Sequence, residues 1–232
     1  MKASAATRAK TPKPKPKRLL AIDTSASPGF AVIEYGADKP ASLVYTDAFP
    51  TDTSLSDAER FEVVRSATAL ICYKYGTATP FDVVVREHFI KGGSKRGTQL
   101  VFGGWAAVDM ALKQFGYVID SANEIPPTTV KKAVGISGKA VKTEKDADLE
   151  ERKTGKRPHS VEKGVREALG LSDDFVFPNN AGGDSSDACA IGVAYLKREG
   201  AIESLNTTNT TNLITDWLRR RHSNSQMNST RN

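Results

Sequence analysis

The sequence contains few cysteines, few aromatic residues and no long apolar segment. Its two cysteines, Cys72 and Cys189, lie far apart and outside any metal-binding spacing, so we interpret both as buried thiols of the core. No apolar run reaches the roughly 18 residues that a membrane span requires, and no apolar segment typical of a secretory signal follows the first methionine. The composition, 39% hydrophobic and 26% charged, is typical of a globular domain with one sizeable core.

The positive charge is concentrated in a few segments. The net charge is +6, but residues 1–18 alone contain seven Lys or Arg and no acid, so the rest of the chain is close to neutral. Two further basic segments lie at residues 86–97 and 128–170. One such segment can be a solvated surface, but a basic tail combined with local basic loops favours a partner that carries phosphate.

The two ends of the chain differ in composition from its middle. Alternating Pro and Lys at residues 11–17 disfavour a helix, so we predict that residues 1–17 form a disordered basic tail. Residues 206–232 begin with an Asn/Thr tract and are predicted to form a polar, mostly disordered tail with one short helix at 213–221. The folded domain is therefore expected at residues 18–205.

The middle of the chain predicts three strands, followed by strands that alternate with helices. Apolar runs and period-two alternation predict strands at residues 19–23, 30–35, 42–49, 81–89 and 117–120. Apolar residues at helical spacing predict helices at residues 57–75, 99–115, 129–134, 161–169 and 185–199. This order predicts an α/β fold with a mixed five-stranded sheet, three antiparallel strands and then two parallel ones, and helices on both faces.

Four acids stand where strands and a helix can bring them to one place. Asp23 ends the first predicted strand, and Glu87 ends the strand that contains Val83–Val85. Because strand side chains alternate, each acid closes an otherwise apolar row on one face. Asp184 and Asp187 are three residues apart at the start of the last helix, a spacing that places both on one helix face. A helix cap or a turn would explain single members, but the joint pattern predicts a cluster.

A cluster of four carboxylates predicts a metal site. Carboxylates that lie close together repel one another and raise one another's pKa unless a cation lies among them. Hard divalent ions prefer oxygen ligands, and two ions about 4 Å apart can activate water and stabilise the leaving oxygen of a phosphodiester. We therefore expect Asp23, Glu87, Asp184 and Asp187 to be both metal ligands and catalytic residues, with two Mg²⁺ ions per site and Mn²⁺ as a substitute.

Four segments resemble the RuvC family of Holliday junction resolvases, which has an RNase H-like fold. Leu19–Ser25 is similar to the family's first catalytic strand, and Val84–Phe89 to the strand that carries its second acid. Gly183–Gly192 looks like the D-x-x-D-A helix of the family, and Val130–Ala140 is similar to its Val-Lys segment and Gly/Ser loop. The resemblance extends over residues 19–196. It implies a crossover junction endodeoxyribonuclease that hydrolyses phosphodiester bonds in branched DNA, for recombination and repair.

The chain departs from this family's pattern at three places. The first acid is followed by Thr24–Ser25, where the family usually has Pro-Gly. The aromatic residue that wedges the junction in the family lies three residues after the second acid, where this chain has Ile90, and Phe89 precedes it. Residues 143–160 form a longer and more densely charged loop than the corresponding loop of the family.

The basic residues complement the acids. A Gly-rich loop at residues 91–97 allows a DNA backbone to approach closely. The resemblance implies that Lys131 and either Lys142 or Lys145 lie beside the metals, where a lysine can hold the scissile phosphate. The residues that we expect to contact DNA are Phe89, Lys91, Lys95, Arg96, Lys131, Lys132, Lys139, Lys142 and Lys145.

Three other functions remain open at this point. Leu20–Ser25 also resembles the opening of ASKHA-fold proteins of the TsaB type, which bind nucleotide or a protein partner, although no glycine-rich nucleotide loop follows later in the chain. A related RNase H-type enzyme would cut RNA–DNA hybrids, because both kinds of helix present the same backbone phosphates. A catalytically inactive protein could bind branched DNA with the same fold, but the presence of all four acids argues against it.

The expected assembly is a homodimer. The resemblance implies it, and a four-way junction has two-fold symmetric strands that a C2 dimer can cut in pairs. The predicted helix at residues 99–115, with Phe102 and Trp105, is a candidate interface, although packing in the core explains its apolar residues equally well. We expect no membrane partner and an intracellular location, in the cytoplasm or on the nucleoid, or in the host cytoplasm for a viral protein.

Overall fold

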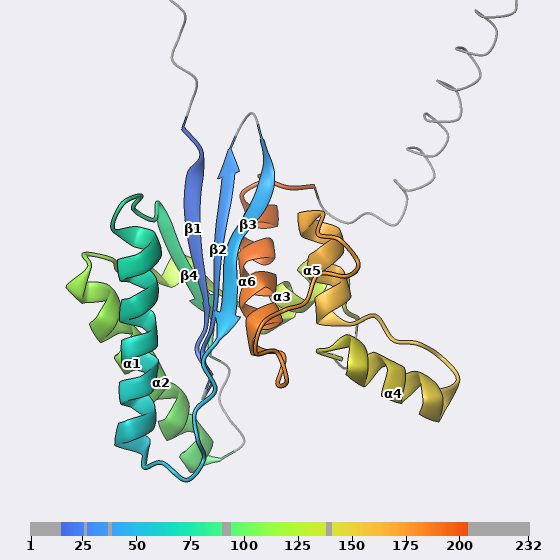
Figure 1. Ribbon diagram of the computed structural model, residues 1–232, viewed down its shortest axis with the longest axis horizontal. Helices are drawn as coiled ribbons and strands as arrows, with labels where there is room; N and C mark the ends of the chain where they lie inside the picture. Colours follow the sequence, from blue (N-terminus) through green and yellow to red (C-terminus); the bar gives the residue numbers. More distant parts are fainter. Residues whose placement is uncertain (1–14, 26, 37–38, 90–93, 138–140, 204–232) are drawn as a thin grey trace, which may run out of the picture. The chain divides into compact units, whose positions relative to one another are not determined.

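The computed structural model describes residues 15–25, 27–36, 39–89, 94–137 and 141–203, and its central element is one five-stranded sheet. The strands are β1 (Lys17–Asp23), β2 (Gly29–Gly36), β3 (Lys39–Ala48), β4 (Val83–Glu87) and β5 (Glu124–Ile125). Their order in the sheet is β3-β2-β1-β4-β5 (Figure 1). β1, β2 and β3 pair antiparallel, whereas β4 pairs parallel to β1 and β5 parallel to β4. The predicted mixed sheet is therefore confirmed.

Helices cover both faces of this sheet. They are α1 (Asp57–Ile71), α2 (Lys95–Gln114), α3 (Pro127–Ala133), α4 (Glu144–Thr154), α5 (Val161–Leu169) and α6 (Asp184–Arg198), with the short helices η1 (Cys72–Gly76) and η2 (Ser121–Asn123). α1 and α2 pack together on one face, and α6 lies on the other with α3 and α5 against it (Figure 1). None of the described helices is long and apolar enough to cross a membrane.

Alternation along the central strand divides the core into two clusters. Leu19 and Ala21 pack toward α6, whereas Leu20 and Ile22 pack toward α1 and α2. Both faces of the strand are therefore buried, and each fully buried Leu or Ile contributes roughly 1.5–3 kcal/mol of transfer free energy. Asp23 continues the row of Leu19 and Ala21, and it therefore emerges on the α6 side where the strand ends.

The fifth strand lies four residues beyond the end of its predicted position. We predict it at residues 117–120, but the chain pairs with β4 at Glu124–Ile125. Val118 is 74% exposed, and the Tyr117 hydroxyl accepts from the N–H of Phe81 and donates to the carbonyl of Gly76. Tyr117 and Ile119 therefore pack against the core cluster between the sheet and α1–α2, while the buried Ile125 supplies the pairing with β4.

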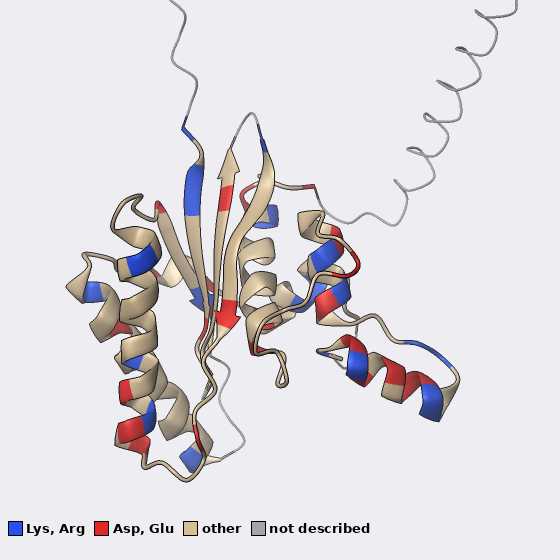
Figure 2. Cartoon of the chain, viewed as in Figure 1, with Lys and Arg blue, Asp and Glu red and all other residues tan. Residues whose placement is uncertain are grey.

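The sequence suggested a loop at residues 143–160, but most of this segment forms the helix α4. Thr143 accepts from the N–H of Asp146 and begins α4, and Gly155 ends it in a left-handed conformation. α4 has no apolar stripe, because Ala147 is its one buried residue, and it carries charged residues of both signs, with acids in its first turn and bases in its last (Figure 2). Arg157, beyond the helix end, forms ion pairs with three acids of α4. A helix held by charge pairs gives no hydrophobic period from which to predict it.

The helix after the Gly-rich loop begins earlier than predicted. α2 starts at Lys95 rather than residue 99, because Ser94 caps it by accepting from the N–H of Gly97 at 3.0 Å. Lys95 and Arg96 therefore belong to a helix and not to a loop. The helix predicted at residues 213–221 lies outside the described residues.

Candidate active site

Asp23 and Glu87 lie at the carboxyl ends of two parallel, neighbouring strands. The register pairs Ala21 with Val85 and Ile22 with Arg86, so the next residue of each strand is an acid. Opposed residues of paired strands project to the same face of a sheet. Both acids are partly buried. The sheet thus brings together two acids that are 64 residues apart in the sequence.

The other two acids are in the first turn of α6, which lies directly on β1 and β2. Gly29 permits this approach, because a Cβ at that position would lie 2.0 Å from the carbonyl oxygen of Asp184. Ser25 donates a hydrogen bond of 3.2 Å to the Asp184 carboxylate. Asp187, one turn later, lines the cavity that also contains the strand acids, whereas Asp184 lies outside its lining. Three of the four predicted acids therefore share one cavity, and the fourth is held beside it.

This cavity has a volume of about 530 Å³, within the usual range of ligand sites, roughly 300–1,000 Å³. Its polar wall contains the three acids together with Lys131 and Lys142. Thr24 adds a hydroxyl oxygen that is buried and has no hydrogen-bond partner among the described residues. A buried hydroxyl without a partner costs free energy, so this oxygen is suited to a bound water or ligand.

Burial and mutual repulsion make the carboxylates of the cavity weak acids. Burial, together with the charges of Asp187 and Glu87, raises the pKa of Asp23 well above its ordinary value. Burial and the charge of Asp187 raise the pKa of Glu87 to about 7. Burial also raises the pKa of Asp187, although Lys142 opposes that shift. Ionisation of all three carboxylates together is therefore unfavourable unless a cation enters the cavity.

Lys142 is the cation closest to the acids. Its Nζ lies 2.7 Å from Oδ2 of Asp187. Burial lowers the pKa of Lys142, but the acids Asp187, Asp23 and Asp184 outweigh burial, so its pKa is raised and the ammonium form is stabilised. The lysine side chain is 47% exposed, so it can also reach an incoming anion from this position.

The donor set fits a hard divalent ion, although the side chains are not yet arranged around one. Among the residues described, no three His, Cys, Asp or Glu side chains are placed to hold one ion together. Asp187 pairs with Lys142, and burial together with the charges of Asp187 and Glu87 disfavours the ionised form of Asp23. Carboxylate oxygens are the ligands that such ions prefer, and an ion would relieve the repulsion that raises the pKa values. Ion binding would require these side chains to turn toward a common point.

Solved structures with similar folds exist, whereas no protein-family model and no curated protein matches the sequence. The structure of Thermus thermophilus RuvC superposes with a TM-score of 0.56 at 20% identity, covering 81% of this chain and 99% of RuvC. T. thermophilus RuvC in complex with a Holliday junction substrate gives a TM-score of 0.55 at 19% identity, covering 82% and 99%. This chain has the RuvC fold. Ydc2, a yeast mitochondrial Holliday junction resolvase, is less similar, with a TM-score of 0.47 at 12% identity over 80% of each chain.

On this RuvC fold, the lysines predicted beside the metals can be placed. Lys131, in α3, and Lys142 both line the cavity. Of Lys142 and Lys145, which the resemblance left open, Lys142 lies beside the acids, and Lys145 is exposed in the first turn of α4. Lys132 is exposed in α3 and does not line the cavity.

The remaining predicted DNA-binding cations lie away from the acids or outside the described residues. Lys95 and Arg96 occupy the first turn of α2. The guanidinium of Arg96 forms two hydrogen bonds with the Asp57 carboxylate of α1, at 2.5 and 2.6 Å, so part of its charge is already neutralised. Lys91 and Lys139 lie outside the described residues. The expectation that these four cations contact DNA stays a prediction.

An aromatic cluster forms one rim of the cavity of the RuvC fold. The rings of Phe89 and Phe102 are 5.0 Å apart, and Trp105 lies 6.3 Å from Phe89 and 6.2 Å from Phe102. Phe89 and Trp105 line the cavity, and Phe102 is 50% exposed. Ile90, the alternative wedge residue, lies outside the described residues. Phe89 is therefore the predicted aromatic contact that the structure places at the site.

Sequence reasoning missed the buried arginine that supports this rim. Arg86 is 5% exposed, and its guanidinium lies 3.8 Å from the centre of the Trp105 ring. It forms ion pairs with Asp109 at 2.8 Å and Glu124 at 2.7 Å, and Glu124 is also 2.9 Å from Nδ1 of His88. An arginine inside an apolar strand must be paired when it is buried, so its position after three valines was the available signal.

Proposed function

We propose that this chain is a metal-dependent endonuclease that hydrolyses phosphodiester bonds in branched DNA, four-way junctions above all. The observation that carries the proposal is one cavity in which Asp23, Glu87 and Asp187 lie with Lys142, in a chain with the RuvC fold. An acidic cluster of raised pKa with an adjacent cation is suited to divalent ions and to a phosphate. The RuvC structure that contains a Holliday junction substrate supports the choice of a branched substrate.

In this proposal the four acids hold two Mg²⁺ ions, or Mn²⁺ in their place. Ions bound there would supply an activated water and stabilise the leaving oxygen. Lys142 would then leave Asp187 and bind a non-bridging oxygen of the scissile phosphate, and Lys131, which also lines the cavity, would be a second cation available to it. A lysine placed where negative charge develops stabilises the transition state more than the ground state.

The aromatic rim supports a branch point rather than a continuous duplex as the substrate. Bases inside a duplex are already stacked on their neighbours, whereas bases at a branch can expose a face. Phe89, which lines the cavity, offers a ring onto which such a base can stack, at a gain of about 1–3 kcal/mol per base.

A four-way junction, with each strand labelled in turn, tests the proposed activity. With Mg²⁺, and also with Mn²⁺, we expect nicks at matched positions in two opposite strands near the branch point. EDTA should abolish them, and re-addition of Mg²⁺ should restore them. Cleavage that persists in EDTA would contradict the metal dependence, and intact strands in both metals would contradict the nuclease.

We further propose that the active form is a homodimer in which α2 contributes to the interface. Met110 and Phe102 are 61% and 50% exposed on this helix, which leaves apolar surface to cover. Sedimentation velocity should give about twice the chain mass of 25.0 kDa. Met110→Glu, a change outside the cavity, should shift the protein toward the monomer and weaken paired nicking. A strict monomer, both free and on a junction, would contradict the dimer.

The basic N-terminal tail is predicted to add affinity for any DNA without choosing its shape. Deleting residues 1–14 leaves every described strand intact and removes four of the seven basic residues at positions 1–18. We expect weaker binding to duplex and junction alike, a smaller dependence of affinity on salt, and an almost unchanged ratio of the two affinities. Titrations of both DNAs at two salt concentrations measure this. A selective loss of junction binding would show that the tail recognises the branch.

A further inference from the structure

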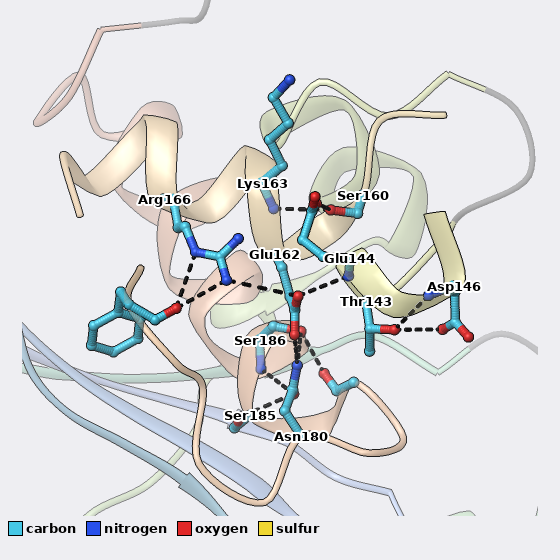
Figure 3. A network of polar contacts seen from close by, with 12 residues as sticks. Thr143, Glu144, Asp146, Ser160, Glu162, Lys163, Arg166, Asn180, Ser185 and Ser186 are labelled. Carbon is cyan, nitrogen blue, oxygen red and sulfur yellow. Dashed lines mark hydrogen bonds and ion pairs between the residues drawn. The ribbon is translucent and has the colours of Figure 1, made fainter. Parts of the chain in front are cut away.

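Glu162, in the first turn of α5, is a buried acid that has no role in the cavity itself. It is 9% exposed, and its two carboxylate oxygens accept hydrogen bonds from different parts of the chain (Figure 3). One oxygen accepts from the backbone N–H of Glu144 at 2.8 Å, and the other from the side-chain amide of Asn180 at 2.6 Å. Arg166 lies 3.8 Å away and balances its charge. The Glu162 carboxylate therefore links two segments that are distant in the sequence, one at Glu144 and one at Asn180.

The first segment carries Lys142. The backbone N–H groups of Val161 and Glu162 donate to the carbonyls of Val141 and Lys142 at 2.9 and 3.2 Å. The Glu162 carboxylate holds the N–H of Glu144 two residues later. The backbone on both sides of Lys142 is therefore fixed to the start of α5.

The second segment carries the two acids of α6. This helix begins at Gly183, which has φ of 86° and no side chain to cap the first turn. Asn180 supplies the cap from outside the helix, since its amide oxygen accepts from the N–H of Ser186 at 3.0 Å and from the hydroxyl of Ser185 at 2.9 Å. The Asn180 side chain is held in turn by Glu162 (Figure 3). One carboxylate therefore also fixes the turn from which the α6 acids project.

The two segments meet in the Lys142–Asp187 ion pair of 2.7 Å. The Lys142 side chain crosses Gly183 closely, because a Cβ there would lie 2.7 Å from Cδ of the lysine. We propose that Glu162 is a positioning residue, which sets the distance between Lys142 and the α6 acids and thereby the geometry in which phosphate and metal are held. This inference rests on the proposed nuclease function.

In the Glu162–Asn180 hydrogen bond, the other partners of each side chain determine which one donates and which one accepts. Substitutions that exchange donor and acceptor can therefore test the positioning role. Glu162 faces two N–H donors, so both of its oxygens must accept. Asn180 must turn its oxygen to the N–H of Ser186, so its NH₂ group must face Glu162. Glu162→Gln places an NH₂ group against a donor, and Asn180→Asp places two carboxylates against each other. The double variant exchanges donor and acceptor, so the bonds from Glu144 N–H, between residues 162 and 180, and from Ser186 N–H can form again, and the net charge is unchanged. The bond of 3.2 Å from the Asn180 amide to the Ser186 hydroxyl and the ion pair of Glu162 with Arg166 do not return.

The test measures the two single variants, the double variant and a control, Glu167→Gln. Glu167 is an exposed acid of the same helix whose carboxylate lies 3.8 Å from His159. The readouts are the single-turnover rate of junction cleavage at saturating DNA, the Kd for the junction, and amide hydrogen exchange of residues 142–144 and 184–187. We expect each single variant to cleave at least about 10-fold more slowly with a Kd within about 2-fold of the original, and to exchange faster in both segments. The double variant should recover most of the rate and protection, and the control should change neither.

The outcomes separate this inference from the proposed function. If the unmodified protein cleaves and Glu162→Gln cleaves at the same rate, or if the double variant is no better than the single ones, the positioning role is wrong. If the unmodified protein does not cleave, the proposed function fails, and exchange still decides the link between the segments. If Glu162→Gln leaves the amide hydrogen exchange of residues 142–144 and 184–187 unchanged, the proposed link between these segments is wrong. Should the single variants fold poorly, recovery of folding in the double variant would support the proposed link, because only the double variant restores a matched donor and acceptor.

Discussion

Replacing Asp23 with Asn is expected to reduce the rate of junction cleavage by at least about 100-fold while leaving junction affinity nearly unchanged. Asp23 ends the central strand, and burial together with the charges of Asp187 and Glu87 raises its pKa. An amide keeps the shape of the side chain but removes one negative charge and one metal-binding oxygen. The proposed site would then hold at most one ion well, whereas the DNA contacts outside the acids are untouched.

The matched control for this change is Asp173→Asn, an exposed acid after α5 that lies outside the cavity. Both variants should be compared for cleavage in Mg²⁺ and for junction binding in Ca²⁺. The control should behave as the original protein in both assays. Full activity of Asp23→Asn would show that Asp23 is not at the reacting centre, and loss of binding together with cleavage would indicate damage to the fold.

The metal-free protein is expected to lose stability as the pH rises from about 4.5 to about 7, and Glu87→Gln should remove part of that loss. The pKa of Glu87 is about 7 in the folded protein, above its ordinary value of 4.5. A carboxyl with a raised pKa binds its proton more tightly in the folded state. The favourable contribution of the Glu87 carboxyl to the free energy of unfolding is therefore complete below pH 4.5, and it disappears as the pH rises through 7. At pH 8 in EDTA, Glu87→Gln should be more stable by on the order of 2 kcal/mol, allowing for solvent around the side chain.

Urea unfolding at pH 5 and pH 8, with EDTA and with Mg²⁺, measures this effect. The variant and the original protein should differ little at pH 5. Mg²⁺ should raise the stability of the original protein at pH 8 by more than that of the variant, because only the original retains all the charge that an ion would neutralise. Equal stability of the two proteins at pH 8 in EDTA would contradict the raised pKa of Glu87.

The sheet and the placement of the acids were predictable because they follow from strand periodicity. Leu19–Ile22 are all apolar, which indicates a strand buried on both faces, and the two-residue period places Asp23 on the same face as Leu19 and Ala21. The position of β5 was not predictable in the same way. Only two of its residues pair, so the chain needed just one buried residue there, and the longer apolar run at 117–120 misled the prediction.

The parts that sequence could not supply depend on long-range polar contacts. Glu162 has the appearance of an ordinary first-turn acid, which the helix dipole favours, and Asn180 that of a turn residue. Their function as a link emerges only when α5 and α6 pack together. The choice between Lys142 and Lys145 likewise depends on the isolated pairing of Val141 with Ser160, which aims the chain at the acids and then starts α4. No local pattern records such a pairing.

The most direct test of the central claim offers four substrates to the purified full-length protein with Mg²⁺. These are a labelled four-way junction, a linear duplex of the same sequence, an RNA–DNA hybrid, and ATP, whose binding is followed separately. We expect paired nicks near the branch of the junction, little cutting of the duplex or the hybrid, and no ATP binding. Preferential cutting of the hybrid would assign the site to an RNase H-type enzyme. ATP binding without any nicking would contradict a nuclease and favour a nucleotide-binding protein of the TsaB type.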